Sequence, residues 1–185
     1  MNKGKIFIVS APSGSGKTTL VNMLCKDFPD RVQETISCTT RQKRDDEVDG
    51  DHYYFLTRDE FLHRREKGEF LEWAEIYGEL YGTLNSDVDA ITKSGKHAIL
   101  VIDTQGAEQL MESIDPVFVF ILPPSIEELE KRLKNRQSEN EEMQKKRLEI
   151  AEKEISKSYE YDFRIRNDDL QRAYTDLKNI IIGEI

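Results

Sequence analysis

A glycine-rich stretch followed by lysine and threonine has the clearest chemical signal in this chain. Residues 11–18 read Ala-Pro-Ser-Gly-Ser-Gly-Lys-Thr, after an apolar run at 6–9 and before a helix-like run at 20–24. Glycines let successive backbone N–H groups turn toward an anion, and the following helix adds its positive N-terminal end. The order strand, loop, helix therefore predicts a phosphate-binding loop (P-loop).

Two side chains of this loop suit nucleotide chemistry. Lys17 can reach the β- and γ-phosphates, and the Thr18 hydroxyl can bind Mg²⁺. The strict motif begins with glycine, where this chain has Ala11, but the following GSGKT is complete. The alternative interpretation is a flexible surface loop, which would need neither the strand before it nor the helix after it.

Composition narrows the class of protein. A chain of 185 residues predicts one domain, and a net charge of −9 argues against electrostatic binding of nucleic acid or membranes. Cys25 and Cys38 form no CxxC pair, so we expect neither a disulfide framework nor a zinc site. The N-terminal apolar run is too short for a signal peptide or a membrane span, so we expect a soluble cytoplasmic protein.

Apolar runs of strand length alternate with helical patterns, which predicts a parallel sheet covered on both faces. The predicted strands are 5–10, 98–103, 117–122 and 162–166, and the predicted helices are 17–27, 105–113, 125–136, 139–158 and 168–182. Residues 34–84 interrupt this alternation with a mostly β pattern: a loop at 37–51, strands at 53–56 and 69–77, and a helix at 59–67. With the charged stretch 137–147, this insertion suggests two mobile flaps that exclude water during phosphoryl transfer.

A set of longer motifs gives the chain a family resemblance. They are SAPSGSGKTT (10–19), SCTTRQKR (37–44), EVDGDHYYF (47–55), GEFLEWAEIYGELYGT (68–83), IDTQGA (102–107), FILPPSIEELEKRL (120–133) and RNDDL (166–170). In this order and spacing they resemble the guanylate kinase family, which phosphorylates GMP from ATP. The resemblance implies an α/β fold: a three-layer P-loop NTPase core with a parallel sheet, a mostly β GMP-binding insertion and a helical lid.

The resemblance also divides the chain, as a single domain over 1–185, into three parts. These are a core (1–33, 85–136 and 158–185), a GMP-binding region (34–84) and a lid (about 137–157). It assigns ATP binding to Ala11, Pro12, Ser13, Gly14, Ser15, Gly16, Lys17, Thr18, Thr19 and Asn167. Asp168, beside Asn167, is predicted to cap the following helix.

The resemblance places the phosphate of GMP on Arg41, Arg44, Tyr53 and Tyr81. Guanidinium groups suit this role because their planar fork can grip phosphate oxygens in pairs. Spacing alone would favour a solvated basic loop around Lys43.

Glu72 is the predicted guanine reader, because a carboxylate accepts from the adjacent N1–H and 2-amino donors that adenine lacks. On a strand at 69–77, alternation would put Glu72 on one face with Phe70, Ala74 and Ile76, where a carboxylate needs a partner. A strand-edge salt bridge is the alternative. The resemblance adds Ser37, Gly82 and Thr83 to the GMP site.

Asp103 ends the apolar strand 99–103, the pattern of an acidic residue near Mg²⁺ or its waters. The alternative is a cap on the next helix. The resemblance also brings Asp103 close to GMP. Relatives usually carry a second acid two positions earlier, where this chain has Val101.

The resemblance gives the lid Arg132, Arg136 and Arg147, which would stabilise charge on the transferring group. With Lys17 and Arg44 they complete the predicted catalytic set. The predicted reaction is in-line transfer from MgATP to GMP, and to dGMP, with Mg²⁺ as cofactor and with no nucleic acid, membrane or protein partner. Two alternatives stay open: a kinase for another nucleoside monophosphate, and a noncatalytic binding module of the same fold.

Overall fold

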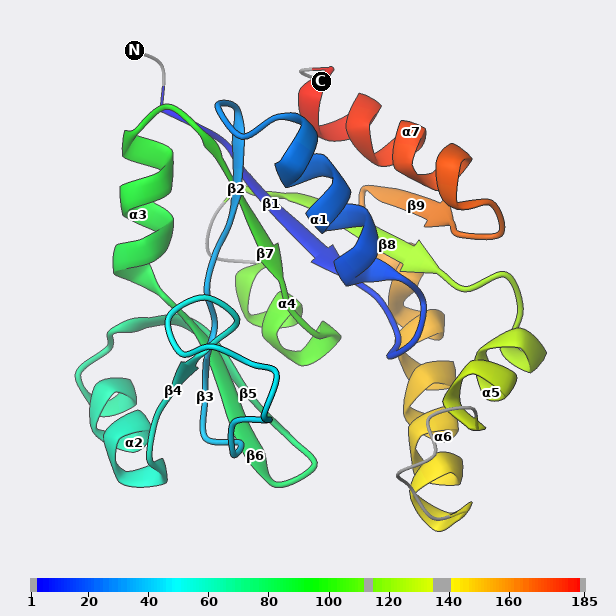
Figure 1. Ribbon diagram of the computed structural model, residues 1–185, viewed down its shortest axis with the longest axis horizontal. Helices are drawn as coiled ribbons and strands as arrows, with labels where there is room; N and C mark the ends of the chain where they lie inside the picture. The colour runs from blue at the N-terminus through cyan, green and yellow to red at the C-terminus, as the bar shows by residue number, and fades with distance from the viewer. Residues whose placement is uncertain (1–2, 112–114, 135–140, 184–185) are drawn as a thin grey trace.

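A computed structural model of the protein describes residues 3–111, 115–134 and 141–183, and within them it contains two sheets (Figure 1). The larger sheet has the order β2-β7-β1-β8-β9, and each neighbouring pair is parallel. Its strands are β1 (Ile6–Ser10), β2 (Val32–Glu34), β7 (His97–Val101), β8 (Val117–Leu122) and β9 (Phe163–Arg166).

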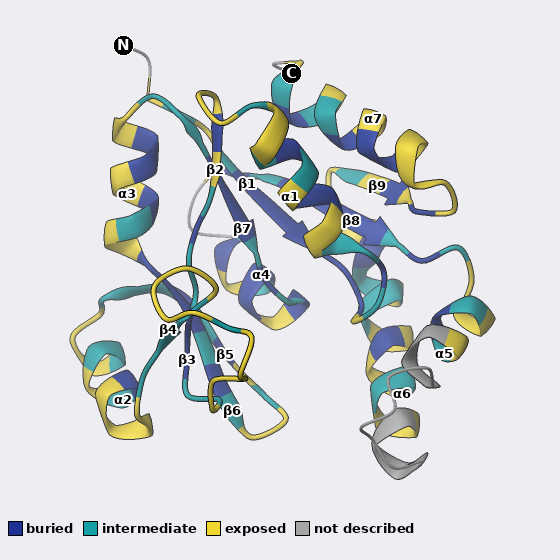
Figure 2. Ribbon diagram, in the orientation of Figure 1, coloured by how far each residue is buried: buried dark blue, intermediate teal, exposed yellow. Residues whose placement is uncertain are grey.

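Helices cover both faces of this sheet, which confirms the predicted three-layer α/β fold with a parallel sheet. Alternate residues of β1 serve the two faces: Phe7 and Val9 pack with α1 (Lys17–Asp27) and α7 (Leu170–Ile182). Ile8 packs on the other face with α3 (Asn85–Lys93) and α4 (Thr104–Leu110). Because both faces are covered, the three central strands β1, β7 and β8 are almost wholly apolar, and they are mostly dark in the burial view (Figure 2).

Side-chain caps fix where two of these helices begin. Asp103 accepts a hydrogen bond from the Gly106 N–H at 3.0 Å and caps α4. Asp169 accepts from the Arg172 N–H at 2.8 Å and caps α7. The prediction that Asp168 caps this helix is therefore wrong by one residue, and Asp168 instead pairs with the Arg172 side chain on the surface.

The smaller sheet has the order β4-β3-β6-β5 and extends from the end of β2 (Figure 1). Its strands are β3 (Cys38–Thr39), β4 (Tyr54–Phe55), β5 (Phe70–Ile76) and β6 (Glu79–Leu84). Helix α2 (Arg58–Glu66) starts with a capping box of Thr57 and Glu60 and packs on this sheet, where Phe61 stacks on Phe70 at 4.3 Å. This is the mostly β insertion that the sequence predicted.

Two helices form the far side of the molecule, α5 (Ile126–Lys134) and α6 (Glu141–Lys157), and they pack through Leu129 and Ala151. Residues 137–140 of the predicted lid lie outside the described residues. Near the end of α6, Lys157 forms an ion pair with Glu108 of α4, which ties this helix to the core. No helix in the described part of the chain is both long and apolar enough to cross a membrane.

The sequence did not predict four of the elements: β2, β3, β6 and α3. Strand β2 has three residues and β3 has two, so neither can show a hydrophobic period. The Thr35 N–H donates to Ile99 O at 3.0 Å, so the chain leaves the large sheet at this point and enters the small one. Ser37 thus lies at the junction of the two sheets.

Candidate active site

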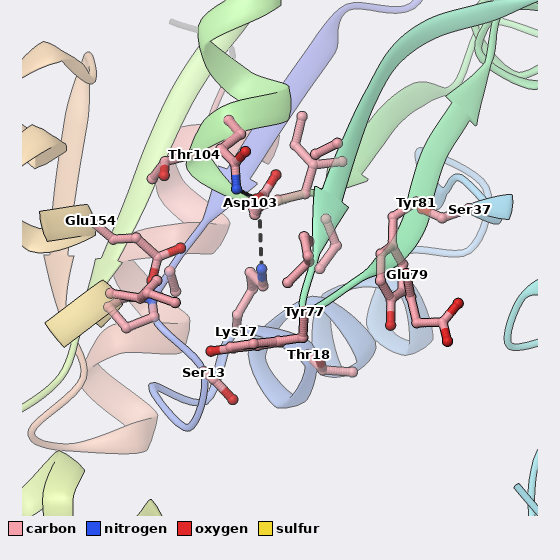
Figure 3. Close-up of a pocket in the computed structure, with 18 of the residues that line it drawn as sticks. Ser13, Lys17, Thr18, Ser37, Tyr77, Glu79, Tyr81, Asp103, Thr104 and Glu154 are labelled. Carbon is pink, nitrogen blue, oxygen red and sulfur yellow. Dashed lines mark hydrogen bonds between the residues drawn. The ribbon is translucent and has the colours of Figure 1, made fainter. Parts of the chain in front are cut away.

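A cavity of about 860 Å³ lies between the two sheets, at the carboxyl ends of β1 and β7 (Figure 3). Open parallel sheets bind ligands at this edge. Its wall includes many of the predicted site residues: Ala11, Pro12, Ser13, Gly14, Gly16, Lys17, Thr18, Thr19, Ser37, Arg41, Arg44, Tyr53, Glu72, Tyr81, Gly82, Asp103 and Arg147. Ser15, Thr83 and Asn167 are buried and are not part of this wall.

The P-loop has the backbone conformation that its glycines predict. Gly14 and Gly16 have φ angles of 91° and 88°, values that side-chain-bearing residues rarely adopt. Ala11 is buried and has no positive φ, so its methyl group causes no backbone strain at the position where the strict motif has glycine. The Ser15 N–H donates to Pro12 O at 3.1 Å and closes the loop on itself.

Asn167 supports the P-loop from behind. Its Nδ2 donates to Ser15 O at 2.8 Å, and its side chain is so close that a Cβ added at Gly16 would lie 2.3 Å from that nitrogen. The sequence assigned Asn167 to ATP binding, and in the described residues it contacts the loop rather than the cavity. Its contribution to a phosphate site would come through the shape of the loop.

Lys17 is partly buried and lines the cavity from the start of α1, and its ammonium donates to Ile102 O at 3.2 Å (Figure 3). Burial lowers the pKa of Lys17, while the carboxylates of Glu154, Asp103 and Glu34 raise it again. Asp103 caps α4, which confirms the helix-cap alternative, and it also lines the cavity, where its role near Mg²⁺ stays a prediction. Burial raises the pKa of Asp103, and the Gly106 N–H and Lys17 oppose that rise.

Sequence reasoning missed Glu34 and Glu154, two of the carboxylates around Lys17. Burial raises the pKa of each to about 7, and Lys17 lowers both. Glu34 ends β2, and no spacing in the sequence connects it with Lys17. Glu154 offered a signal, because it lies three residues after Ala151 on the apolar stripe of the predicted helix 139–158.

The predicted acceptor arginines differ in their surroundings. Arg41 grips Glu47 with two hydrogen bonds of 3.0 and 2.6 Å, and its guanidinium lies 5.5 Å from the centre of the Tyr53 ring. Arg44 has an exposed side chain, and its N–H donates to Glu47 at 2.9 Å. Arg41 lowers the pKa of Glu47 to about 2, so this acid is ionised at neutral pH. Glu47 was missed as a site residue, although it lies three residues after Arg44.

Glu72 is a buried acid with unused hydrogen-bonding capacity. Its side chain is 3% exposed, and neither its Oε1 nor the Thr83 Oγ1 beside it has a hydrogen-bond partner among the described residues. Burial raises the pKa of Glu72 to about 7, with contact from Thr83 lowering it and the charge of Asp103 raising it. The free Oε1 of this buried carboxylate can accept from a ligand that donates hydrogen bonds. Glu72 forms no ion pair among the described residues, which disfavours the alternative of a strand-edge salt bridge.

One packing expectation around Glu72 is wrong. A bulge lies between Phe70 and Glu72, since two β5 residues there face one step of β6. It turns Phe70 toward α2 and Trp73, so Phe70 and Glu72 do not share a face. Ala74 and Ile76 line the cavity with Glu72, as alternation predicted.

The lid arginines are described in part. Arg147 of α6 lines the cavity, donates to Ser13 Oγ at 3.4 Å, and stacks on Tyr77 of the β5–β6 turn. The side chain of Arg132 and all of Arg136 lie outside the described residues.

No cysteine or histidine is among the described residues that line the cavity. Cys38 is fully buried, and burial raises the pKa of its thiol to about 12, which makes it a poor nucleophile. Within the described ranges, no three side chains of the kinds His, Cys, Asp and Glu gather to hold a metal ion by themselves.

Comparison with known proteins gives one consistent family. A family model described as guanylate kinase matches residues 3–184. The chain is 50% identical over 180 residues to a guanylate kinase of Chlamydia felis, covering 97% of this chain and 88% of that protein. It is also 50% identical over 182 residues to one of Protochlamydia amoebophila, covering 98% and 92%. A crystal structure of guanylate kinase from Anaplasma phagocytophilum superposes with a TM-score of 0.81 at 34% identity, covering 99% of this chain and 87% of that one.

Proposed function

The chain belongs to the guanylate kinase family, and we propose that its cavity transfers the γ-phosphoryl group of ATP to the phosphate of GMP, giving ADP and GDP. The observation that carries the proposal is the pairing of two ends of one cavity. One end is a P-loop whose lysine lines the cavity, and the other is the buried Glu72 carboxylate with an unused oxygen.

Glu72 would read guanine. The N1–H and 2-amino groups of guanine are adjacent donors, and an ionised carboxylate accepts from both, whereas adenine presents an acceptor at N1. The Thr83 hydroxyl beside Glu72 and the Ser37 side chain at the sheet junction would add contacts to the base. The close packing of β6 on β5 requires glycine at Gly82, because a Cβ at that position would lie 2.9 Å from both Glu72 O and the Phe70 ring.

The acceptor phosphate would lie between Arg41, Arg44, Tyr53 and Tyr81. The rings of Tyr53 and Tyr81 are 6.2 Å apart and line the cavity beside Arg41, so two hydroxyls and two guanidinium groups are available. Glu47 currently holds Arg41. The phosphate would therefore share or take over hydrogen bonds that an internal acid now accepts.

The donor phosphates would lie on the backbone N–H groups of residues 13–18, at the start of α1. The residues present fit a magnesium ion carried by the nucleotide, since Mg²⁺ keeps several waters and needs only one or two protein ligands. Thr18 is exposed at the cavity wall and would bind the ion directly, and Asp103 would hold it directly or through its waters. The bound ion would supply charge neutralisation at the phosphates.

The chain's own contribution to the transfer is positioning and charge neutralisation. Lys17 would follow the γ-phosphoryl group, Arg44 would orient the acceptor phosphate, and Arg147 would face the bridging oxygens from the lid. Arg132 and Arg136 would act from the same side. The acceptor is already an anion, so no residue need act as a strong base.

We propose that the single domain consists of three functional regions: a core (1–33, 85–136 and 158–185), an acceptor region (34–84) and a lid (about 137–157). dGMP would serve as a second acceptor, because it keeps both the base edge and the phosphate. The two free cysteines and the net charge of −9 are consistent with a cytoplasmic location.

The two alternatives make different demands on the site. A kinase for a base without paired donors would not need a buried acid in the cavity, and a noncatalytic module would not need an intact P-loop with its lysine in the cavity. Both features are present, which favours the guanylate kinase activity.

The test is ADP formation from MgATP with GMP, dGMP, AMP, UMP, CMP and dTMP offered singly. Turnover confined to GMP and dGMP is the expected result. Turnover with a nucleotide of another base would support phosphoryl transfer but contradict the role of Glu72 as the guanine reader. Folded protein that turns over none of them would favour the binding module.

A further inference from the structure

The turn between β5 and β6 contains an unfavourable residue. Ile76 pairs with Glu79, so Tyr77 and Gly78 form a two-residue turn with φ angles of 53° and 86°. Positive φ at both positions defines a turn that favours Asn-Gly or Asp-Gly. Among the described residues Tyr77 is the only non-glycine with a positive φ. An aromatic residue in this conformation is strained, and such strain is found where a side chain has another task.

The Tyr77 ring lies at the cavity rather than in a core. It is 45% exposed, lines the cavity, and extends toward the P-loop residues Ser13 and Lys17 in Figure 3. The Arg147 guanidinium carbon lies 5.0 Å from the centre of this ring, within the range of a cation–π contact. The same guanidinium donates to Ser13 Oγ at 3.4 Å. Arg147 is thus held between the acceptor hairpin and the P-loop.

The turn that carries Tyr77 is anchored at both ends of its hairpin. At the base, Gln109 of α4 accepts from the Trp73 N–H at 3.3 Å and donates to Trp73 O at 2.6 Å. At the tip, Arg58 of α2 donates to Gly78 O at 3.1 Å. The ring is therefore a fixed surface on which a long, flexible side chain can be held.

We propose that Tyr77 is a positioning residue for phosphoryl transfer, which holds the Arg147 guanidinium over the P-loop by stacking. This inference rests on the proposed function and adds to it a link between the acceptor region and the lid. An unrestrained arginine samples many rotamers, so a stacked one reaches the transferring phosphoryl group with less loss of freedom. The contact would matter most when charge develops on that group.

Three variants test the proposal. Tyr77→Asn removes the ring and puts a residue suited to positive φ into the turn, Tyr77→Phe keeps the ring, and Tyr159→Asn is the matched control. Tyr159 also stacks on an arginine, with its ring centre 4.2 Å from the Arg164 guanidinium carbon, but it is 77% exposed and is not part of the cavity wall.

For Tyr77→Asn we expect kcat to fall about three- to tenfold, as loss of one partly exposed cation–π contact predicts, with a melting temperature equal to or above that of the wild type. Tyr77→Phe and Tyr159→Asn should keep the wild-type kcat. In an Arg147→Ala background, Tyr77→Asn should cause no further loss, because the two residues act through one contact.

Other outcomes overturn the proposal. If kcat and melting temperature fall together, Tyr77 has a structural role in the turn. If KM for ATP or GMP rises while kcat is unchanged, the ring binds a substrate directly. An additive loss in the Arg147→Ala background would separate the two residues. The wild-type enzyme is measured in the same assay. If the wild type shows no GMP-dependent turnover, the proposed function has failed; if it turns over normally, the variants test the role of Tyr77 alone.

Discussion

The donor side and the acceptor side of the cavity bind phosphate by different means. The donor side, residues 11–19 with Asn167 behind them, offers backbone N–H groups fixed between β1 and α1. The acceptor side, residues 34–84, offers arginine side chains on a largely exposed loop (Figure 2). One of them, Arg41, already forms an ion pair with Glu47. The P-loop is therefore formed by folding alone, whereas on the acceptor side the phosphate must replace Glu47 as the partner of Arg41.

Within the acceptor side, the base pocket and the phosphate pocket differ again. Glu72 lies in a sheet strand, buried and without a partner for Oε1, so it is ready for donors. Arg41 lies in a loop and is fully paired within it. We therefore expect guanine recognition to be preformed and phosphate recognition to require rearrangement. The following predictions test this contrast between the sites, from the largest effect to the smallest.

Lys17→Met should separate the donor side from the acceptor side. Removing the ammonium that neutralises the transferring group should lower kcat about a thousandfold. The ammonium of Lys17 donates to Ile102 O in the core, and none of the side chains proposed to hold GMP pairs with it among the described residues, so GMP affinity by calorimetry should stay near the wild-type value. Near-normal turnover in this variant would refute the P-loop assignment.

Glu72→Gln should damage the base pocket alone. One of two acceptors for guanine is lost and an amide N–H₂ can face the guanine donors, so kcat/KM for GMP should fall about 10²-fold. KM for ATP should not change, because the donor side is untouched. Steady-state kinetics with each substrate varied measures both. Unchanged GMP use would remove Glu72 from the site.

The same substitution should stabilise the protein without nucleotide, and more so at high pH. The pKa of Glu72 is raised from 4.5 to about 7 in the folded state. Stability therefore falls as pH rises through this window, by roughly 3 kcal/mol when the carboxyl is fully ionised. Urea unfolding should show a gain for Glu72→Gln that is small near pH 4.5 and largest above about pH 7. Glu75→Gln, on an exposed position of the same strand, is the control and should show little gain.

Gly106→Ala should disturb the base pocket from outside the small sheet. A Cβ at Gly106 would lie 2.2 Å from Glu72 Oε2, so the carboxylate must move. Alanine usually stabilises a helix relative to glycine, but the clash with Glu72 should outweigh this gain. We expect kcat/KM for GMP to fall about tenfold with KM for ATP unchanged. Equal losses for both nucleotides would indicate a general disturbance of α4 instead.

Asn167→Ala should make the P-loop less rigid, because it removes a hydrogen bond to the loop backbone. The variant leaves Ser15 O without its buried partner, so KM for ATP should rise about three- to tenfold. Asp168→Ala is the matched control, because this neighbouring side chain pairs at the surface with Arg172 and with the Asp169 N–H, and its loss should leave KM unchanged. A rise in KM for GMP, rather than ATP, would contradict the assignment of Asn167 to the donor side.

Sequence alone located the elements whose patterns are local. The helix predicted at 17–27 and the strand predicted at 117–122 have the same bounds in the structure. The helix begins directly after the glycine-rich loop, and the strand is a continuous apolar run that two prolines follow. The P-loop, the second sheet and the buried Glu72 were also expected. The motifs that indicated them are contiguous in the chain.

Tertiary structure decided what depends on residues far apart in the chain. The bulge that turns Phe70 away from Glu72, the placement of Asn167 behind Ser15, and the approach of Glu34 and Glu154 to Lys17 all need neighbours that no local pattern records. The strained Tyr77 and its stack on Arg147 belong to this class, since a turn conformation and a partner seventy positions away set them. Periodicity reports which face of an element is buried, and only the packing of elements against one another determines what a side chain on that face meets.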